Sequence, residues 1–193
     1  HIQRNLLLGL PIPLPPLEEQ KRIAGILNKA EEIKKLREEA DKKTEELIPA
    51  IFHEMVGSRN KRGEELPAGW KWMKMGGLMT DVQSGFASGE RDPEGVIQLR
   101  MNNVNTTGGF DWSKTLRVPR NAASLSKYRL DEGDVLFNNT NSPDLVGKAA
   151  VFNRHEELIV YSNHFTRLRP DKNGLLSGYL GAWLNQQWNG GVF

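Results

Sequence analysis

The hydrophobic positions of the chain change their spacing twice, which divides it into segments. The first segment, residues 1–16, ends in an apolar run with four prolines, Pro11, Pro13, Pro15 and Pro16. Each proline fixes φ, lacks a backbone N–H and pushes the preceding residue toward extended backbone. Residues 1–16 are therefore expected to form a short strand and a rigid proline arm that stops where a helix begins.

The second segment, residues 17–56, has the pattern of a long amphipathic helix. Apolar residues recur every seven positions, with further apolar side chains on or beside the same stripe, and charged residues occupy the remaining faces. At about 1.5 Å per residue such a helix is about 55–60 Å long. Pro49 is expected to kink it or split it in two.

A single helix with one apolar stripe needs a partner that covers the stripe. The chain offers no second helix of comparable length, so a second copy of the chain or a missing part of a longer protein is expected to pair with it; a core helix of a bundle is the alternative. The pattern predicts these residues in a dimer interface: Ile26, Ala30, Ile33, Leu36, Ala40, Leu47 and Ile51.

After a polar linker at residues 57–65, the sequence pattern over residues 66–193 is typical of a mixed, strand-rich α+β domain. Short apolar runs predict strands at 96–100, 134–137, 148–152 and 158–161. Gly-, Pro- and Asp-rich turns separate them, among them 131–133 and 169–174, and a 3.6-residue period predicts a helix at 175–189.

Composition and motifs point away from catalysis. The 193 residues carry a net charge of only +2, no cysteine and no apolar run long enough to span a bilayer, which fits a cytoplasmic protein. The four histidines are scattered, and no nucleotide-binding or metal-binding motif occurs. The acidic residues Asp131, Glu132 and Asp134 are interpreted as a solvated turn. A binding or scaffolding protein without enzymatic activity or cofactor is expected.

Two polar runs follow predicted strands, at residues 100–105 and 138–142. Asn can pair bidentately with adenine and Arg with guanine, whereas Ser and Lys suit phosphate oxygens. The alternative is that the asparagines only cap turns through local hydrogen bonds. The candidate base contacts are Arg100, Asn102, Asn103, Asn139 and Asn141, and the candidate phosphate contacts are Ser142, Lys148 and Lys114.

The junction Pro11-Ile12-Pro13-Leu14-Pro15-Pro16-Leu17-Glu18-Glu19-Gln20 resembles the specificity (S) subunits of type I restriction–modification systems. In that family a target-recognition domain ends in such an arm and leads into a conserved long helix. A second recognition domain often opens with Leu-Pro-x-Gly-Trp, and Leu66-Pro67-Ala68-Gly69-Trp70 matches that pattern. The sequences 133–137 and 146–148 also resemble family motifs. The resemblance covers nearly the whole chain.

The resemblance implies a protein that binds double-stranded DNA, recognises part of a split target and docks methyltransferase (M) and restriction (R) subunits. It makes residues 1–16 the tail of one recognition domain, 17–56 a dimerising spacer and 66–193 the first part of another domain. Since the helix holds the tail far from its own head, an antiparallel homodimer with exchanged N-terminal tails is expected.

Two other functions are consistent with the residues. The chain could be a scaffold that pairs two binding modules through its helix without contacting DNA. It could also carry carbohydrate-binding modules, because Trp70, Trp72 and Trp112 could stack on sugars.

Overall fold

The computed structural model describes residues 8–56 and 66–193, so the predicted linker at 57–65 and the start of the predicted strand at 1–16 lie outside the described residues. The chain divides into two compact units, residues 1–47 and 48–193. The boundary between the two units falls inside the long helix. None of the described helices is long and apolar enough to span a membrane.

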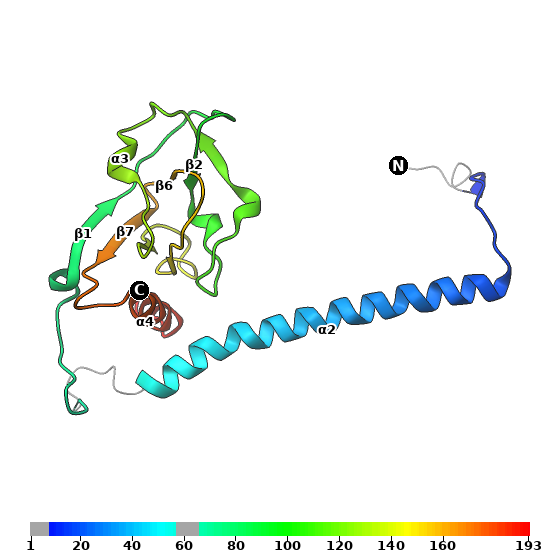
Figure 1. The fold of residues 1–193 in the computed structure, drawn as a ribbon, viewed down its shortest axis with the longest axis horizontal. Coiled ribbons are helices and arrows are strands. Elements are labelled where there is room, and N and C mark those ends of the chain that lie inside the picture. The colour runs from blue at the N-terminus through cyan, green and yellow to red at the C-terminus, as the bar shows by residue number, and fades with distance from the viewer. Residues whose placement is uncertain (1–7, 57–65) are drawn as a thin grey trace. The chain divides into compact units, whose positions relative to one another are not determined.

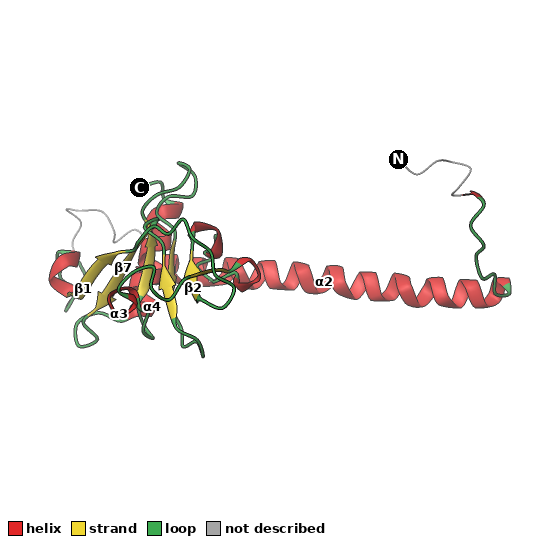
Figure 2. Cartoon of the chain, turned by 90° about the horizontal axis from the view of Figure 1, so that it is seen from above, coloured by secondary structure: helices red, strands yellow, loops and turns green. Residues whose placement is uncertain are grey.

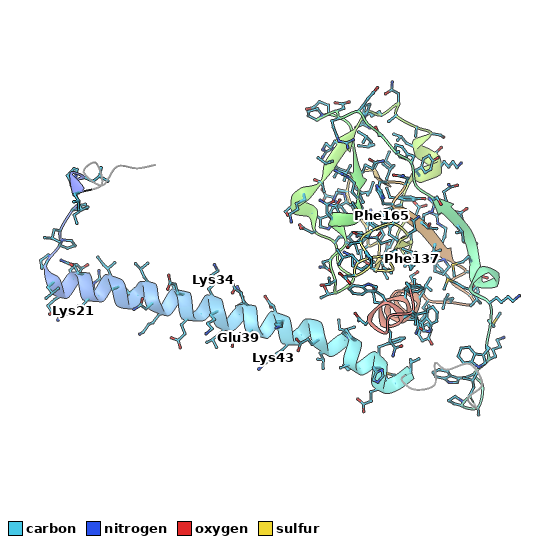
Figure 3. All side chains as sticks on the ribbon, turned by 180° about the vertical axis from the view of Figure 1, so that it is seen from behind. Lys21, Lys34, Glu39, Lys43, Phe137 and Phe165 are labelled. Carbon is cyan, nitrogen blue, oxygen red and sulfur yellow. The ribbon has the colours of Figure 1, made fainter. Side chains whose placement is uncertain are left out.

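The first unit contains the proline arm and most of helix α2. Residues 10–16 have no regular secondary structure, and α2 runs as one helix over Leu17–Val56, with Pro49 inside it (Figure 1). The predicted helix is confirmed at both ends, whereas a split at Pro49 is wrong. The side chains of Lys21, Lys34, Glu39 and Lys43 project away from the helix (Figure 3).

The second unit is an α+β domain with two sheets, as the sequence predicts. The larger sheet has the order β1-β7-β4-β5 and is antiparallel throughout; the smaller has the order β3-β2-β6, with β2 and β6 parallel. The strands are β1 (Met79–Ser84), β2 (Val96–Leu99), β3 (Leu116–Val118), β4 (Val135–Asn138), β5 (Ala149–Val151), β6 (Ile159–Tyr161) and β7 (Phe165–Pro170). The helical elements are η2 (Met75–Leu78), η3 (Met101–Asn103), η4 (Trp112–Lys114), α3 (Leu125–Tyr128) and α4 (Ser177–Asn189).

Successive side chains of each strand point to opposite faces of its sheet, and this alternation builds the domain in layers. In β4, Leu136 packs into a core that joins the two sheets, together with Leu99 of β2 and Phe165 of β7. Its neighbour Val135 faces the other way, against Leu180 and Leu184 of α4. A third cluster packs the outer face of the smaller sheet against the segment that contains α3. The helix α4 thus covers the outer face of the larger sheet, and the segment with α3 covers that of the smaller sheet; the strands are yellow in Figure 2.

The sequence analysis found β2, β4, β5, β6 and α4 but missed β1, β3 and β7. The turn that it places at 169–174 begins too early, because Arg169 and Pro170 belong to β7. In β7 the burial pattern includes buried Arg167 and Leu168 side by side, so charged residues within the strand concealed it. A strand that carries arginines into the interior does not show the alternation that single-sequence patterns detect.

The turn at residues 131–134 is not the solvated acidic turn expected from the sequence. Asp134 is only 1% exposed, and its two carboxylate oxygens accept hydrogen bonds of 2.7 Å from Nε and Nη2 of Arg169. Asp134 also accepts the backbone N–H of Asp131 at 2.8 Å. This bidentate pair raises the pKa of Arg169 and ties the start of β4 to the end of β7.

Asp134→Ala is predicted to lower the free energy of unfolding by about 3 kcal/mol, because it removes one partner of a largely buried ion pair. Asp131→Ala is the matched control: its side chain is 47% exposed and it bonds the same guanidinium, so a loss below about 1 kcal/mol is expected. Denaturant unfolding of both variants measures the difference. Equal losses would contradict the assigned role of Asp134.

Candidate nucleic-acid interface

The two polar loops that the sequence singled out meet at Lys148. The backbone of Lys148 pairs with Asn138, since the Asn138 N–H donates to the Lys148 carbonyl oxygen at 2.8 Å. The Lys148 side chain then crosses to the other loop, where Nζ donates to the Val104 carbonyl oxygen at 2.6 Å. The loops at 100–111 and 138–147 are therefore held together by one side chain, although about forty residues separate them.

Asn103 holds the first loop in shape from inside. It is fully buried; its Oδ1 accepts the Arg100 N–H at 2.8 Å and its Nδ2 donates to the Asp111 carbonyl oxygen at 2.9 Å. Both ends of the amide are thus used within the protein. The structure favours the turn-capping alternative for Asn103 over base contact.

The second loop, after β4, is fixed more loosely. Asn139 is half-buried and its Nδ2 donates to the Thr166 hydroxyl at 2.9 Å, while its Oδ1 accepts the Thr140 hydroxyl at 3.0 Å. Asn141 is half-buried and its Oδ1 accepts the Ser142 N–H at 2.9 Å. Thr140 and Ser142 are exposed, so the tip of this loop presents hydroxyls and amide groups to solvent.

Three candidate residues lie at the surface of the first loop and the segment after it. Asn102 is exposed and Arg100 is half-buried. Lys114 is exposed and lies 3.7 Å from Asp111, a weak surface pair. Together with Ser142 and Asn141, these side chains are the ones that a ligand outside the domain could reach.

Lys148 itself is not at the surface, contrary to the expected phosphate contact. It is 5% exposed, and burial lowers the pKa of its ammonium group. Its direct partner is the Val104 carbonyl oxygen, so its position suits a support for the two loops. Replacing it is expected to disturb the loops before it removes any contact to a ligand.

A further supporting residue, Asn185 on α4, was missed by the sequence analysis. Its Oδ1 accepts the Ala149 N–H and its Nδ2 donates to the Ala149 carbonyl oxygen, both at 2.9 Å. A Cβ at Gly108 would lie 2.6 Å from this Nδ2, so the first loop passes close over the side chain. An asparagine on a helix gives no sequence signal for such a role.

The three tryptophans that could have stacked on sugars do not line one common groove. Trp112 stacks on His155 with ring centroids 4.7 Å apart. Trp70 and Trp72 line an apolar groove that does not include Trp112. Among residues 8–56 and 66–193, no group of three or more His, Asp or Glu side chains is placed to hold a metal ion.

In the first unit the apolar side chains are uncovered. The predicted interface residues of α2 are all exposed along the helix, and so are Leu8, Leu10, Ile12 and Leu14 of the arm. Gln20 fixes the arm to the first turn: its Nε2 donates to the Pro15 carbonyl oxygen at 2.7 Å and its N–H to that of Pro16 at 3.0 Å. An exposed apolar surface of this extent is typical of an interaction site.

Comparisons with known proteins agree with this architecture of a long helix and an α+β domain. No family model matches the chain. It is 31% identical over 164 residues to the type I restriction enzyme MjaVIII specificity subunit of Methanocaldococcus jannaschii, which covers 78% of this chain and 37% of that protein. It is 25% identical over 184 residues to the type I restriction enzyme StySPI specificity subunit of Salmonella potsdam, covering 88% and 38%.

Two solved structures of type I restriction proteins are also similar to this chain. The HsdS subunit from Thermoanaerobacter tengcongensis matches with a TM-score of 0.55 and 26% identity over 93% of this chain and 44% of that one. A chain from a structure described as the basis of complex assembly and conformational transition of the type I R-M system matches with a TM-score of 0.52 and 26% identity, over 91% and 42%. The chain thus belongs to the family of type I restriction specificity subunits and spans less than half the length of each of these proteins.

Lys148→Ala is predicted to lower the free energy of unfolding by about 2 kcal/mol, because the Val104 carbonyl oxygen loses its donor and a cavity remains. Lys114→Ala, at an exposed lysine, is the control and should change the free energy of unfolding by less than about 0.5 kcal/mol. Thermal or denaturant unfolding of the two variants makes the comparison. A Lys148→Ala protein as stable as Lys114→Ala would contradict the supporting role.

The pH dependence of the free energy of unfolding gives a second test of the role of Lys148. Folding lowers the pKa of Lys148, so between that lowered pKa and the ordinary lysine pKa of 10.5 the unfolded chain binds more protons than the folded one. The stability of the wild type relative to Lys148→Met should therefore increase as the pH rises toward 10.5. If the difference in free energy of unfolding between the wild type and Lys148→Met stays constant or decreases with pH, Lys148 is not buried as described.

Proposed function

We propose that the chain is a DNA-binding specificity subunit, or part of one, of a type I restriction–modification system. It recognises one part of a split DNA target and carries out no reaction itself. The observation that carries this proposal is the meeting of the two polar loops at Lys148, on a domain related to restriction specificity subunits. Two loops from different parts of the sequence can read adjacent base pairs only if something holds them together.

The proposed contacts divide the candidate residues into two groups. Arg100, Asn102 and Asn141 are assigned to base edges, and Lys114 and Ser142 to phosphate oxygens, because their side chains are accessible. Asn103, Asn139 and Lys148 are assigned to holding the loops, because internal hydrogen bonds occupy them.

We also propose a two-fold dimer through α2. Its apolar stripe is exposed in the single chain, and an antiparallel second helix with the same stripe would cover it. In such a pair, residues 1–16 of one copy complete the recognition domain formed by residues 66–193 of the other, and residues 17–56 set the spacing. Half-sites on one face of a duplex repeat about every 34–36 Å, so a rigid helical spacer selects the permitted gap.

The charged faces of α2 remain outside this dimer and are proposed to dock the methyltransferase and restriction subunits. One relative comes from a structure concerned with assembly of a type I R-M system, which supports such docking. Because the proposed ligand is chromosomal or invading DNA, the proposed location is the cytoplasm. A scaffold that does not bind DNA is the competing function, and DNA binding separates the two.

Binding to random duplex DNA is predicted to be measurable by electrophoretic mobility shift and to weaken steeply with salt. Lys114→Ala should reduce the slope of log K against log salt by about 1, because one phosphate contact is lost. Lys34→Ala on α2 removes the same charge and should leave the slope unchanged. Absence of binding by the wild type, or an equal effect of Lys34→Ala, would contradict the proposed interface.

The chain is predicted to be a dimer at micromolar concentration in sedimentation equilibrium. Ile33→Asp should give monomers, since it places a charge in the apolar stripe, whereas Lys34→Ala on a neighbouring face should leave the dimer intact. A monomeric wild type would rule out the proposed pairing.

A further inference from the structure

An apolar groove of about 310 Å³ lies on the domain formed by the second unit, and no residue of the two polar loops lines it. Its wall includes Trp70, Trp72, Tyr179 and Trp183, with Met73 and Lys71 beside them. Trp70, Trp72, Met73 and Tyr179 are each between 42% and 50% exposed. Four aromatic side chains on one open surface make it a site for an apolar partner.

We propose that this groove binds the proline arm, Leu10–Pro16, of a second copy of the chain. This inference rests on the proposed dimer and identifies where its exchanged tail is seated. Proline-rich segments bind aromatic-lined grooves because they are already extended and lose little conformational entropy on binding. The arm has prolines at the PxxP spacing, Pro13 and Pro16, and its intervening apolar side chains are uncovered in the single chain.

The hydrogen-bonding groups of the arm and of the groove are complementary. Residues Leu10–Pro16 have seven carbonyl oxygens but only three N–H groups, because four of the seven are prolines. An extended proline-rich backbone has no internal hydrogen bonds, so most of these carbonyls need an outside donor. Several exposed side chains of the groove supply donors: the indole N–H groups of Trp70 and Trp72, the ammonium of Lys71 and the hydroxyl of Tyr179, which can also accept.

Charged side chains flank both the groove and the arm. Lys71 lies in the wall of the groove and Lys74 follows it, and both are exposed. The arm leads directly into Glu18 and Glu19 at the first turn of α2. In the single chain Glu18 pairs with Lys21 and Glu19 with Arg22, so the seating of the arm rests on apolar contact and hydrogen bonds.

The arm of the same chain is too short to fill the groove. Val56, the last residue of α2, is part of the groove wall, and the helix begins 39 residues earlier at Leu17. At about 1.5 Å per residue the helix separates its two ends by about 58 Å. Residues 8–16 can extend over about 30 Å at most. A second copy in antiparallel orientation brings its arm to this end of the helix.

Disulfide cross-linking of the full chain tests the proposal, and the absence of cysteine leaves no background thiol. Leu14→Cys chains are mixed with differently tagged Met73→Cys chains, allowed to exchange and mildly oxidised. Disulfide-linked heterodimers are expected, because a seated arm raises the effective concentration of the two thiols to about millimolar. The control mixes Leu14→Cys with Val82→Cys, which is 54% exposed on β1 against 50% for Met73, and should yield little product.

Sedimentation of the same mixtures separates failure of this proposal from failure of the dimer. Dimers that form no Leu14→Cys/Met73→Cys disulfide, or link equally to Val82→Cys, would overturn the groove as the seat of the arm while leaving the dimer intact. Monomers would overturn the dimer itself. Selective linking in a dimer supports both.

A double-mutant cycle gives an independent measurement without thiols. Leu14→Ala and Trp72→Ala should each weaken dimerisation by about tenfold or more, since each removes a side chain from a desolvated contact. The double variant should be little weaker than either single variant, because the same contact is lost in all three. Strictly additive effects would show that the two side chains do not meet. Trp72 is 49% exposed, so its truncation leaves the core of the domain untouched.

Discussion

The apolar stripe of α2 is the constraint on which the rest of the account depends. A helix of 40 residues with one exposed apolar face and charged residues elsewhere gains too little from its own backbone to be rigid in isolation. In the proposed dimer, a second copy covers the stripe and makes the helix a stiff spacer. The same pairing moves a short proline arm across a distance that it could not cross within one chain, so spacing and domain completion follow from one interface.

In the α+β domain, buried polar side chains shape the loops. Asp134 with Arg169 joins β4 to β7, Asn103 shapes the first loop, and Lys148 holds that loop against the second. Asn103 and Lys148 were candidates for contacts to DNA and are instead used inside the protein. The accessible residues, such as Asn102 and Ser142, sit on loops whose shape is fixed from within, which suits selective recognition.

Local pattern was enough to predict the long helix, the α+β class and the strands with clean apolar runs. It failed for β7, where arginines enter the interior, because burial of an arginine depends on a carboxylate supplied by a distant segment. The same limit applies to the site. Residue chemistry identified both polar loops, yet it could not separate Asn102 from its neighbour Asn103. One of them faces solvent and the other bonds to the Asp111 carbonyl oxygen eight residues away.

The central claim is that two copies present two recognition domains to one DNA duplex at a fixed spacing. Selection of bound duplexes from a random-sequence library by the purified chain, followed by sequencing, tests it most directly. The account predicts enrichment of an inverted repeat whose two halves are separated by a nonspecific gap of constant length. Enrichment of a single half-site, of halves at variable spacing, or of no sequence at all would contradict it.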